Sequence, residues 1–258
     1  MAALRPPDIL SLSASSLETW RRCRRAYRSQ VLLSLPPSDE SAPPELGNAV
    51  HAILRLIHET GSCRDADHVR GVLDGHAMSG EGAVLACVER HARRCPHPVD
   101  AGWHEVELAR FHRRPAPMFM AVGRLDAVWI HDGLLDVRDY KTGSYPGARV
   151  GDDPRARLQA WLVADRARRR GLRVRVRYEH LAPGIDEDPE PLEPDDDDLG
   201  AIGEELRATV AAIRSEAAWE GVADPAVCGW CRYRSICPDR AGPAPAGPSW
   251  PSPPHPQA

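Results

Sequence analysis

The sequence predicts an α/β fold, a mixed sheet of about four or five strands with helices on both faces. Polar and apolar residues alternate, as they do in strands, over 103–111, 122–129, 134–140 and 172–181. Apolar residues recur at helical spacing over 45–60, 154–170 and 198–219. At 258 residues the chain is long enough to bury the core of one such domain.

The segment 123–143 predicts two neighbouring antiparallel strands joined by a turn at 131–133. Such a hairpin would bring Asp126 and Asp139 together on adjacent strands, with Lys141 beside them. Two close carboxylates repel one another unless a cation lies between them, and oxygen ligands suit Mg²⁺ or Mn²⁺. Such an ion can neutralise a phosphate oxygen and lower the pKa of a bound water. The adjacent ammonium would orient that water or stabilise developing negative charge.

Lys141 is the only lysine among the 33 Lys and Arg residues of the chain. A sequence that uses arginine for all its other basic charges therefore has a compact ammonium with an adjustable pKa here. A solvated charge at a strand end is the simpler interpretation. The position beside two carboxylates favours a role in chemistry.

The segment GRLD, followed by a hairpin and DYKTG, resembles the catalytic core of the PD-(D/E)XK nuclease superfamily, specifically its RecB-like exonuclease branch. The resemblance implies a restriction-endonuclease-like core that binds one or two Mg²⁺ or Mn²⁺ ions and hydrolyses DNA phosphodiester bonds. It also implies metal ligands at His51, Asp126, Asp139 and the main-chain carbonyl of Tyr140. Lys141 would position the attacking water.

Two residues on flanking helical segments extend this resemblance. Gly47 and His51 fit the G-x-x-x-H helix that supplies a histidine to the metal in this branch, although a lone histidine near an apolar stripe is usually a packed or capping residue. Gln159 resembles the glutamine of a Q-x-x-x-Y pattern after the catalytic lysine, with Val163 here in place of the tyrosine. The resemblance therefore implies that Gln159 contacts DNA or orients the site.

Seven cysteines in a sequence without a secretion signal favour metal chemistry over disulfides. Cys228, Cys231 and Cys237 form a C-x₂-C-x₅-C pattern, and Cys23 is the obvious fourth ligand. By itself such a set suits zinc or an iron–sulfur cluster equally well. The early cysteine and the late triplet resemble the iron–sulfur members of the nuclease branch, which implies a [4Fe-4S] cluster stapling the C-terminal segment to the first helix.

The remaining cysteines lie in 62–100, where the sequence predicts two helices. The spacings of Cys63, Cys87 and Cys95 match no ligand pattern, so we expect packed thiols. His58, on the preceding helical segment, is expected to be structural.

The formal net charge of −4 is unusual for a DNA-binding protein until it is localised. Residues 186–198 hold nine acidic and no basic side chains, and subtracting these nine negative charges leaves +5 on the rest. We expect the acidic segment to be a solvated loop. Arginines over 21–28 and 155–170 then predict a surface that follows a phosphate backbone.

We expect one nuclease domain over 1–240, including the cysteine cluster, followed by a proline-rich disordered tail over 241–258. No apolar run approaches the length of a membrane span and the first residues lack a signal peptide, which predicts a cytoplasmic protein. A Walker A motif requires Gly-Lys, and the only lysine follows Tyr140, so this chain is not itself a nucleotide-driven motor.

The resemblance implies a metal-dependent DNA nuclease, an exonuclease acting on single-stranded ends in DNA repair or recombination. Its expected partners are DNA and a separate helicase, or a repair or defence protein, with CRISPR spacer acquisition as the alternative pathway. Two other interpretations are open. One is a non-catalytic DNA-binding scaffold subunit of a helicase–nuclease or CRISPR/defence complex. The other is a zinc-stabilised interaction module in which the DYKTG match is accidental.

Overall fold

The computed structural model describes residues 9–38, 45–76, 82–95, 102–113, 115–143, 149–182, 184–185 and 187–242. The chain divides into two compact units. The sheet unit comprises residues 7–14 and 43–214, and the cysteine unit comprises 1–6, 15–42 and 215–258. From residue 243 onward, the tail expected over 241–258 lies outside the described residues.

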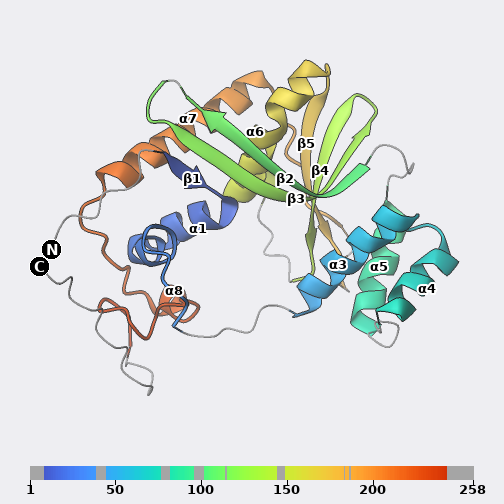
Figure 1. The fold of residues 1–258 in the computed structure, drawn as a ribbon, viewed down its shortest axis with the longest axis horizontal. Helices are drawn as coiled ribbons and strands as arrows, with labels where there is room; N and C mark the ends of the chain where they lie inside the picture. Colours follow the sequence, from blue (N-terminus) through green and yellow to red (C-terminus); the bar gives the residue numbers. More distant parts are fainter. Residues whose placement is uncertain are drawn as a thin grey trace, which may run out of the picture. The chain divides into compact units, whose positions relative to one another are not determined.

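The sheet unit is built on a five-stranded mixed sheet (Figure 1). Its strands are β1 (Leu10–Leu12), β2 (Gly102–His112), β3 (Phe119–His131), β4 (Leu134–Lys141) and β5 (Arg173–His180). Antiparallel β2 pairs along most of one side of β3, while parallel β1 and antiparallel β4 share its other side. β5 extends the sheet parallel to β4. The predicted α/β class and mixed sheet are confirmed.

The β3–β4 hairpin closes where the sequence predicts. Asp132 (φ 49°) and Gly133 (φ 72°) both adopt left-handed backbone in the two-residue turn. Such turns match the right-handed twist of the paired strands, and Asp-Gly is a favoured pair for them. All residues of β4 except Lys141 are buried. The hairpin is therefore a rigid support at the centre of the sheet.

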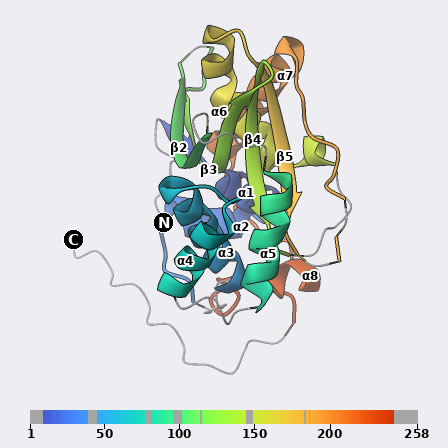
Figure 2. The same ribbon diagram turned by 90° about the vertical axis from the view of Figure 1, so that its right-hand side faces the viewer.

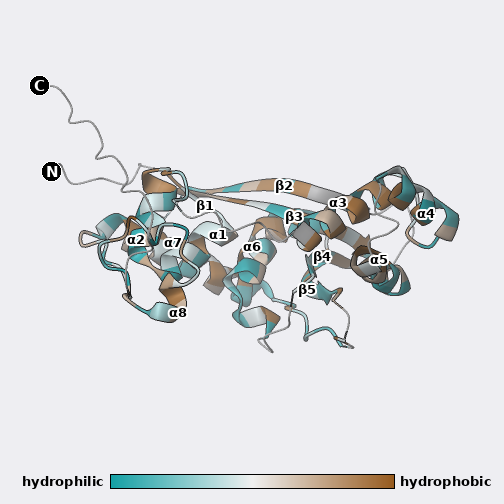
Figure 3. Ribbon diagram, turned by 90° about the horizontal axis from the view of Figure 1, so that it is seen from below, coloured by the Kyte–Doolittle hydropathy of each residue, from teal (hydrophilic) through white to brown (hydrophobic). Residues whose placement is uncertain are grey.

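The helices of the sheet unit flank this sheet (Figures 1 and 2). They are α3 (Glu45–Thr60), α4 (Ala66–Gly75), α5 (Gly82–Arg94), α6 (Pro154–Arg169) and α7 (Asp196–Ser215), with a 3₁₀ turn at Val150–Asp152. Both hydrophobic and hydrophilic residues occur along α3 and α4 (Figure 3). None of the helices in the described ranges has the length and apolar character that crossing a membrane requires.

Helices α3, α4 and α5 gather near one end of the strands (Figure 1) and share one apolar core with them. Ile53 and Ile57 of α3 and Val88 of α5 belong to this core, together with Trp129 of β3 and Tyr140 of β4. Helix α6 instead packs across β2, β3, β4 and β5. Helices α3 and α6 therefore both pack against the β3–β4 hairpin.

The acidic segment is anchored rather than merely solvated. Leu192 forms an antiparallel bridge with Val176 of β5, which partly covers the edge of the sheet. Its carboxylates pair with arginines of the sheet unit: Asp188 with Arg94, Glu193 with Arg175, and Asp196 with Arg168. Arg168 is one of the arginines predicted to form a phosphate-binding surface, and here it pairs with Asp196 instead.

The cysteine unit combines segments from both ends of the sequence. It contains α1 (Ala14–Arg22, whose first residue belongs to the sheet unit), α2 (Arg24–Tyr27), a π-helical turn (Arg28–Leu32) and α8 (Pro225–Cys228). The rings of Trp20, Tyr27 and Trp219 pack together, with centroids 5.4 to 6.4 Å apart. Helix α7 ends at Ser215, earlier than the predicted 219, and Trp219 has a left-handed φ of 51°.

Candidate active site

Asp126 and Asp139 occupy facing positions on β3 and β4. The paired register ends at Ala127 and Arg138, and Asp126 and Asp139 are the next residues of the two strands beyond this last pair. Oδ2 of Asp126 accepts a hydrogen bond of 2.8 Å from the main-chain N–H of Tyr140. The hairpin therefore holds the two predicted carboxylates at the end of the β3–β4 ladder, next to its last pair.

His51 reaches this point from α3. Its Nδ1 lies 3.3 Å from Oδ1 of Asp126, and its Nε2 lies 3.1 Å from the main-chain oxygen of Tyr140. Burial lowers the pKa of His51, but the hydrogen bond and the attraction of Asp126 outweigh it, so the pKa lies above its usual value. The structure thus brings together an imidazole, a carboxylate and a carbonyl that the resemblance assigns to a metal.

Asp139 is held at both of its carboxylate oxygens. Oδ2 pairs with Nζ of Lys141, and Oδ1 accepts a hydrogen bond of 3.0 Å from Nε2 of Gln159 on α6. Gln159 is only 4% exposed. Its Oε1 is also buried and finds no hydrogen-bond partner within the described ranges. Gln159 therefore orients the carboxylate from inside the protein rather than from an open surface.

Lys141 has a second neighbour, which sequence reasoning missed. Its Nζ lies 4.3 Å from the ring centroid of Tyr178 on β5, in cation–π geometry. The Tyr178 hydroxyl donates to Asp153, the residue that caps the start of α6. Burial, followed by the hydrogen bond to Asp153, raises the pKa of Tyr178, so its proton is retained. Only the parallel register of β4 and β5, which pairs Asp139 with Tyr178, could have revealed this contact.

The donor set at the hairpin fits a divalent cation. Asp126 and Asp139 offer carboxylate oxygens, Tyr140 a carbonyl oxygen and His51 an imidazole nitrogen. Oxygen-rich sets of this kind suit Mg²⁺ or Mn²⁺. The Lys141 ammonium adds a proton donor beside the same carboxylates. Such an arrangement can stabilise negative charge on a phosphate and position a water molecule.

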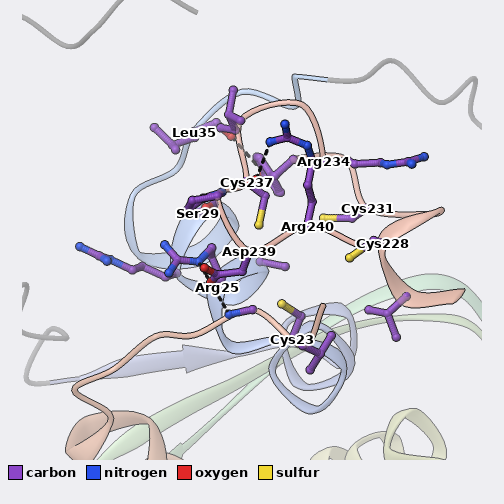
Figure 4. A pocket seen from close by; sticks show the side chains of 18 of the residues that line it. Cys23, Arg25, Ser29, Leu35, Cys228, Cys231, Arg234, Cys237, Asp239 and Arg240 are labelled. Carbon is purple, nitrogen blue, oxygen red and sulfur yellow. Dashed lines mark hydrogen bonds and ion pairs between the residues drawn. The ribbon is translucent and has the colours of Figure 1, made fainter. Parts of the chain in front are cut away.

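The cysteine unit holds the other predicted ligand set. Cys23, Cys228, Cys231 and Cys237 line a cavity of about 170 Å³. Figure 4 shows their sulfur atoms turned toward a shared space, Cys23 from the junction of α1 and α2 and the other three from the C-terminal segment. Burial raises the pKa of the Cys231 and Cys237 thiols. Four thiols around one cavity fit an iron–sulfur cluster or zinc.

Ion pairing keeps the two segments of this unit together. Nε of Arg25 lies 2.5 Å from Oδ2 of Asp239, and the Tyr233 hydroxyl donates to the carbonyl of Leu35. Arg25, one of the arginines over 21–28 that were predicted to contact a phosphate backbone, is therefore engaged in an ion pair within the protein. Arg22 likewise pairs with Glu18.

Comparison with known proteins gives one match at the level of a family. The model of the PD-(D/E)XK nuclease superfamily matches residues 11–238. None of the curated protein sequences matches the chain significantly.

Two solved structures are similar to the chain at low identity. SSO0001 is 15% identical with a TM-score of 0.42, over 90% of this chain and 87% of that one. A candidate exonuclease from Eubacterium rectale is 12% identical with a TM-score of 0.46, over 79% of each chain.

Proposed function

This chain belongs to the PD-(D/E)XK nuclease superfamily, and from that premise we propose that it is a Mg²⁺- or Mn²⁺-dependent deoxyribonuclease of the RecB-like branch. Its substrate is DNA, and its proposed action is exonucleolytic, on single-stranded ends. The observation that carries the proposal is the contact of His51 with both Asp126 (3.3 Å) and the Tyr140 carbonyl (3.1 Å).

The metal ligands in this proposal are His51, Asp126, Asp139 and the main-chain oxygen of Tyr140. A bound divalent cation supplies positive charge for a phosphate oxygen and makes a water molecule more acidic. The chain's own part is to hold these donors in place before substrate arrives. The Tyr140 N–H holds Asp126, and Gln159 and Lys141 hold Asp139. Helix α3 places His51 against Asp126 and the Tyr140 carbonyl.

Lys141 is the proposed catalytic cation. Its ammonium would hold the attacking water by hydrogen bonding and stabilise the charge that develops on phosphate. Asp139 and the ring of Tyr178 limit where the ammonium can lie. Gln159 acts through Asp139, because it is buried and donates a hydrogen bond to that carboxylate. We therefore assign Gln159 a positioning role rather than a DNA contact.

The cysteine unit is proposed to carry a [4Fe-4S] cluster on Cys23, Cys228, Cys231 and Cys237. Such a cluster would bond the segment after α1 to the C-terminal segment, adding covalent links to the Arg25–Asp239 pair. The proposed role of the cluster is structural, since it links two distant segments of the chain. Anaerobically purified protein should be brown and contain iron and sulfide, whereas Cys231→Ser should lose both. Colourless protein with zinc bound by these four thiols would contradict the cluster.

The proposed pathway is DNA repair or recombination together with a separate helicase, with CRISPR spacer acquisition or another defence system as the alternative. The single lysine excludes a Walker A motif from this sequence, and in this proposal the helicase is a separate protein.

The test of the nuclease proposal is cleavage of end-labelled single-stranded and duplex DNA with Mg²⁺ or Mn²⁺. Asp126→Asn removes one proposed ligand charge, and Lys141→Ala removes the ammonium. Both should abolish cleavage while leaving thermal unfolding close to that of the parent. The product ladder of the parent protein gives the direction of digestion.

Asp132→Asn is the matched control, because it neutralises a carboxylate at the far end of the same hairpin. The Asp132 side chain is 90% exposed, and asparagine tolerates its left-handed φ. This variant should cleave at the parental rate. Cleavage that survives in Asp126→Asn and Lys141→Ala would contradict the assigned site. DNA binding without any cleavage by cluster-loaded parent protein would identify a scaffold subunit instead.

A further inference from the structure

A second group of metal-binding side chains lies in the sheet unit, apart from the four cysteines discussed above. His58 and Cys63 come from the end of α3 and the residues after it, and His91 and Cys95 from the end of α5 and the residue after it. One ligand atom from each of the four lies within 4.8 Å of all the others. We propose that these residues bind one structural Zn²⁺ ion in a Cys₂His₂ site.

The separations bracket those expected around tetrahedral zinc. Zn–S bonds of about 2.3 Å and Zn–N bonds of about 2.0–2.1 Å place ligand atoms roughly 3.3–3.8 Å apart around the ion. Sγ of Cys95 lies 3.9 Å from Nε2 of His58, and the two Nε2 atoms of His58 and His91 lie 2.8 Å apart. Small movements of the two rings would bring all four ligands to zinc distance.

The burial and the ligand types of this group favour Zn²⁺ over other metal ions. His91, Cys63 and Cys95 are at most 3% exposed, so this is not a surface cluster of polar groups. Two thiolates, two neutral imidazoles and one divalent cation carry no net charge, which removes the cost of burying isolated charges. Thiolate and imidazole together favour Zn²⁺ over the oxygen-seeking Mg²⁺ or Mn²⁺. The ion would therefore differ from the one proposed at the hairpin.

Hydrogen bonding orients the His91 ring for metal binding. Its Nδ1 lies 2.8 Å from Oε1 of Glu179 on β5, and an ionised carboxylate only accepts, so Nδ1 carries a proton. In the neutral ring that a metal ion binds, the lone pair is then on Nε2, the atom that faces His58. A carboxylate behind a histidine is the usual way in which proteins fix the tautomer of a zinc ligand.

Glu179 is itself held from the opposite side. Its Oε2 accepts from Nη1 of Arg138 (3.0 Å), whose Nε donates to Asp136 (3.2 Å). The proposed ion would thus join the ends of α3 and α5 and connect them, through His91, with β4 and β5. The site is structural because all four positions of a tetrahedral ion are taken by protein.

The sequence did not predict this site, because each half is a single histidine–cysteine pair. His58-x₄-Cys63 and His91-x₃-Cys95 each contain too little information to stand out. Cys63, Cys87 and Cys95 are all buried in the apolar core, as the prediction of packed thiols requires. The proposed site adds a ligand role for Cys63 and Cys95, whereas Cys87 lies outside the group.

The test is metal analysis and zinc-edge X-ray absorption on the full chain with its cysteine cluster loaded anaerobically. The parent protein should contain about one zinc per chain with two nitrogen and two sulfur neighbours. Absence of zinc, zinc with four sulfur neighbours only, or a Cys63–Cys95 disulfide in freshly purified protein would overturn the proposal. None of these readouts depends on nuclease activity.

Variants add a second line of evidence. Cys95→Ser should lose the zinc, and Cys87→Ser, at a buried thiol of α5 outside the group, should keep it. Glu179→Gln keeps all four ligands and should weaken zinc binding by about 10- to 100-fold in competition with a chelator. Zinc retained in full by Cys95→Ser, with unchanged coordination, would refute the assignment. Since a ligand variant can fail to fold, the measurement on the parent protein decides.

Discussion

Removing the Tyr140 hydroxyl should stabilise the protein, although the residue lies in the candidate active site. This hydroxyl is buried, and no hydrogen-bond partner for it occurs within the described ranges. A buried polar group without a partner costs about 1–3 kcal/mol. Tyr140→Phe deletes this group and keeps the ring that packs between His51 and His91, at centroid distances of 5.8 and 5.2 Å. The free energy of unfolding should therefore rise by about 1–3 kcal/mol.

For a chain of this size, each kcal/mol shifts the unfolding temperature by about 2–4 °C. Thermal unfolding followed by circular dichroism resolves such a change. Cleavage should stay close to the parental rate, because Tyr140 contributes only its main-chain carbonyl to the proposed metal site. The substitution thus distinguishes the effect of the Tyr140 side chain on stability from the role of its main-chain carbonyl in cleavage.

Tyr178→Phe is the matched control, since it deletes the same atom at a hydroxyl that has a charged partner. The Tyr178 hydroxyl donates to Asp153, and a hydrogen bond to a charged group contributes about 1.5–3 kcal/mol. Its unfolding temperature should fall. A fall for Tyr140→Phe as well, or a loss of cleavage of more than tenfold, would refute the reasoning.

Two further substitutions test the packing around the site. Gln159→Leu removes the donor to Asp139 and should lower cleavage by about 10- to 100-fold, with a higher Mn²⁺ requirement measured by metal titration; unchanged kinetics would exclude the positioning role. Gly203→Ala on α7 would place a Cβ 2.9 Å from Nε1 of Trp161 and should destabilise the fold by about 1–3 kcal/mol. Gly200→Ala on the same helix meets nothing within 4 Å and should stabilise by about 1 kcal/mol, so equal denaturation midpoints for both alanines would contradict the close packing.

The parts of the site that were predictable are local in sequence. Asp126 and Asp139 belong to one hairpin, whose alternation and Asp-Gly turn determine their register. His51 could be placed near them only through the family resemblance, because nothing in a helical stripe says which strand it will face. Its position beside Asp126 is now observed, whereas its role as a ligand stays a prediction.

The unpredicted contacts all depend on non-local packing. Tyr178 meets Lys141 because β5 pairs in parallel with β4, a register set by the α6 crossover rather than by either strand. Glu179 looked like an ordinary charge on an alternating strand, yet it is buried and holds both His91 and Arg138. Buried polar networks of this kind leave no periodic signal, since their members satisfy one another across separate elements.

The three-residue strand β1 constrains the order in which the sheet can assemble. Leu10–Leu12 pairs with Phe119–Ala121, about a hundred residues further along the chain, whereas β2, β3 and β4 follow one another closely. During synthesis the amino-terminal strand leaves the ribosome first and finds its partner only after the long strand has emerged. Until then Phe119–Ala121 of β3 have one unpaired edge, which other nascent chains can join. A bulky fusion ahead of β1 should therefore hinder this late docking step and promote aggregation.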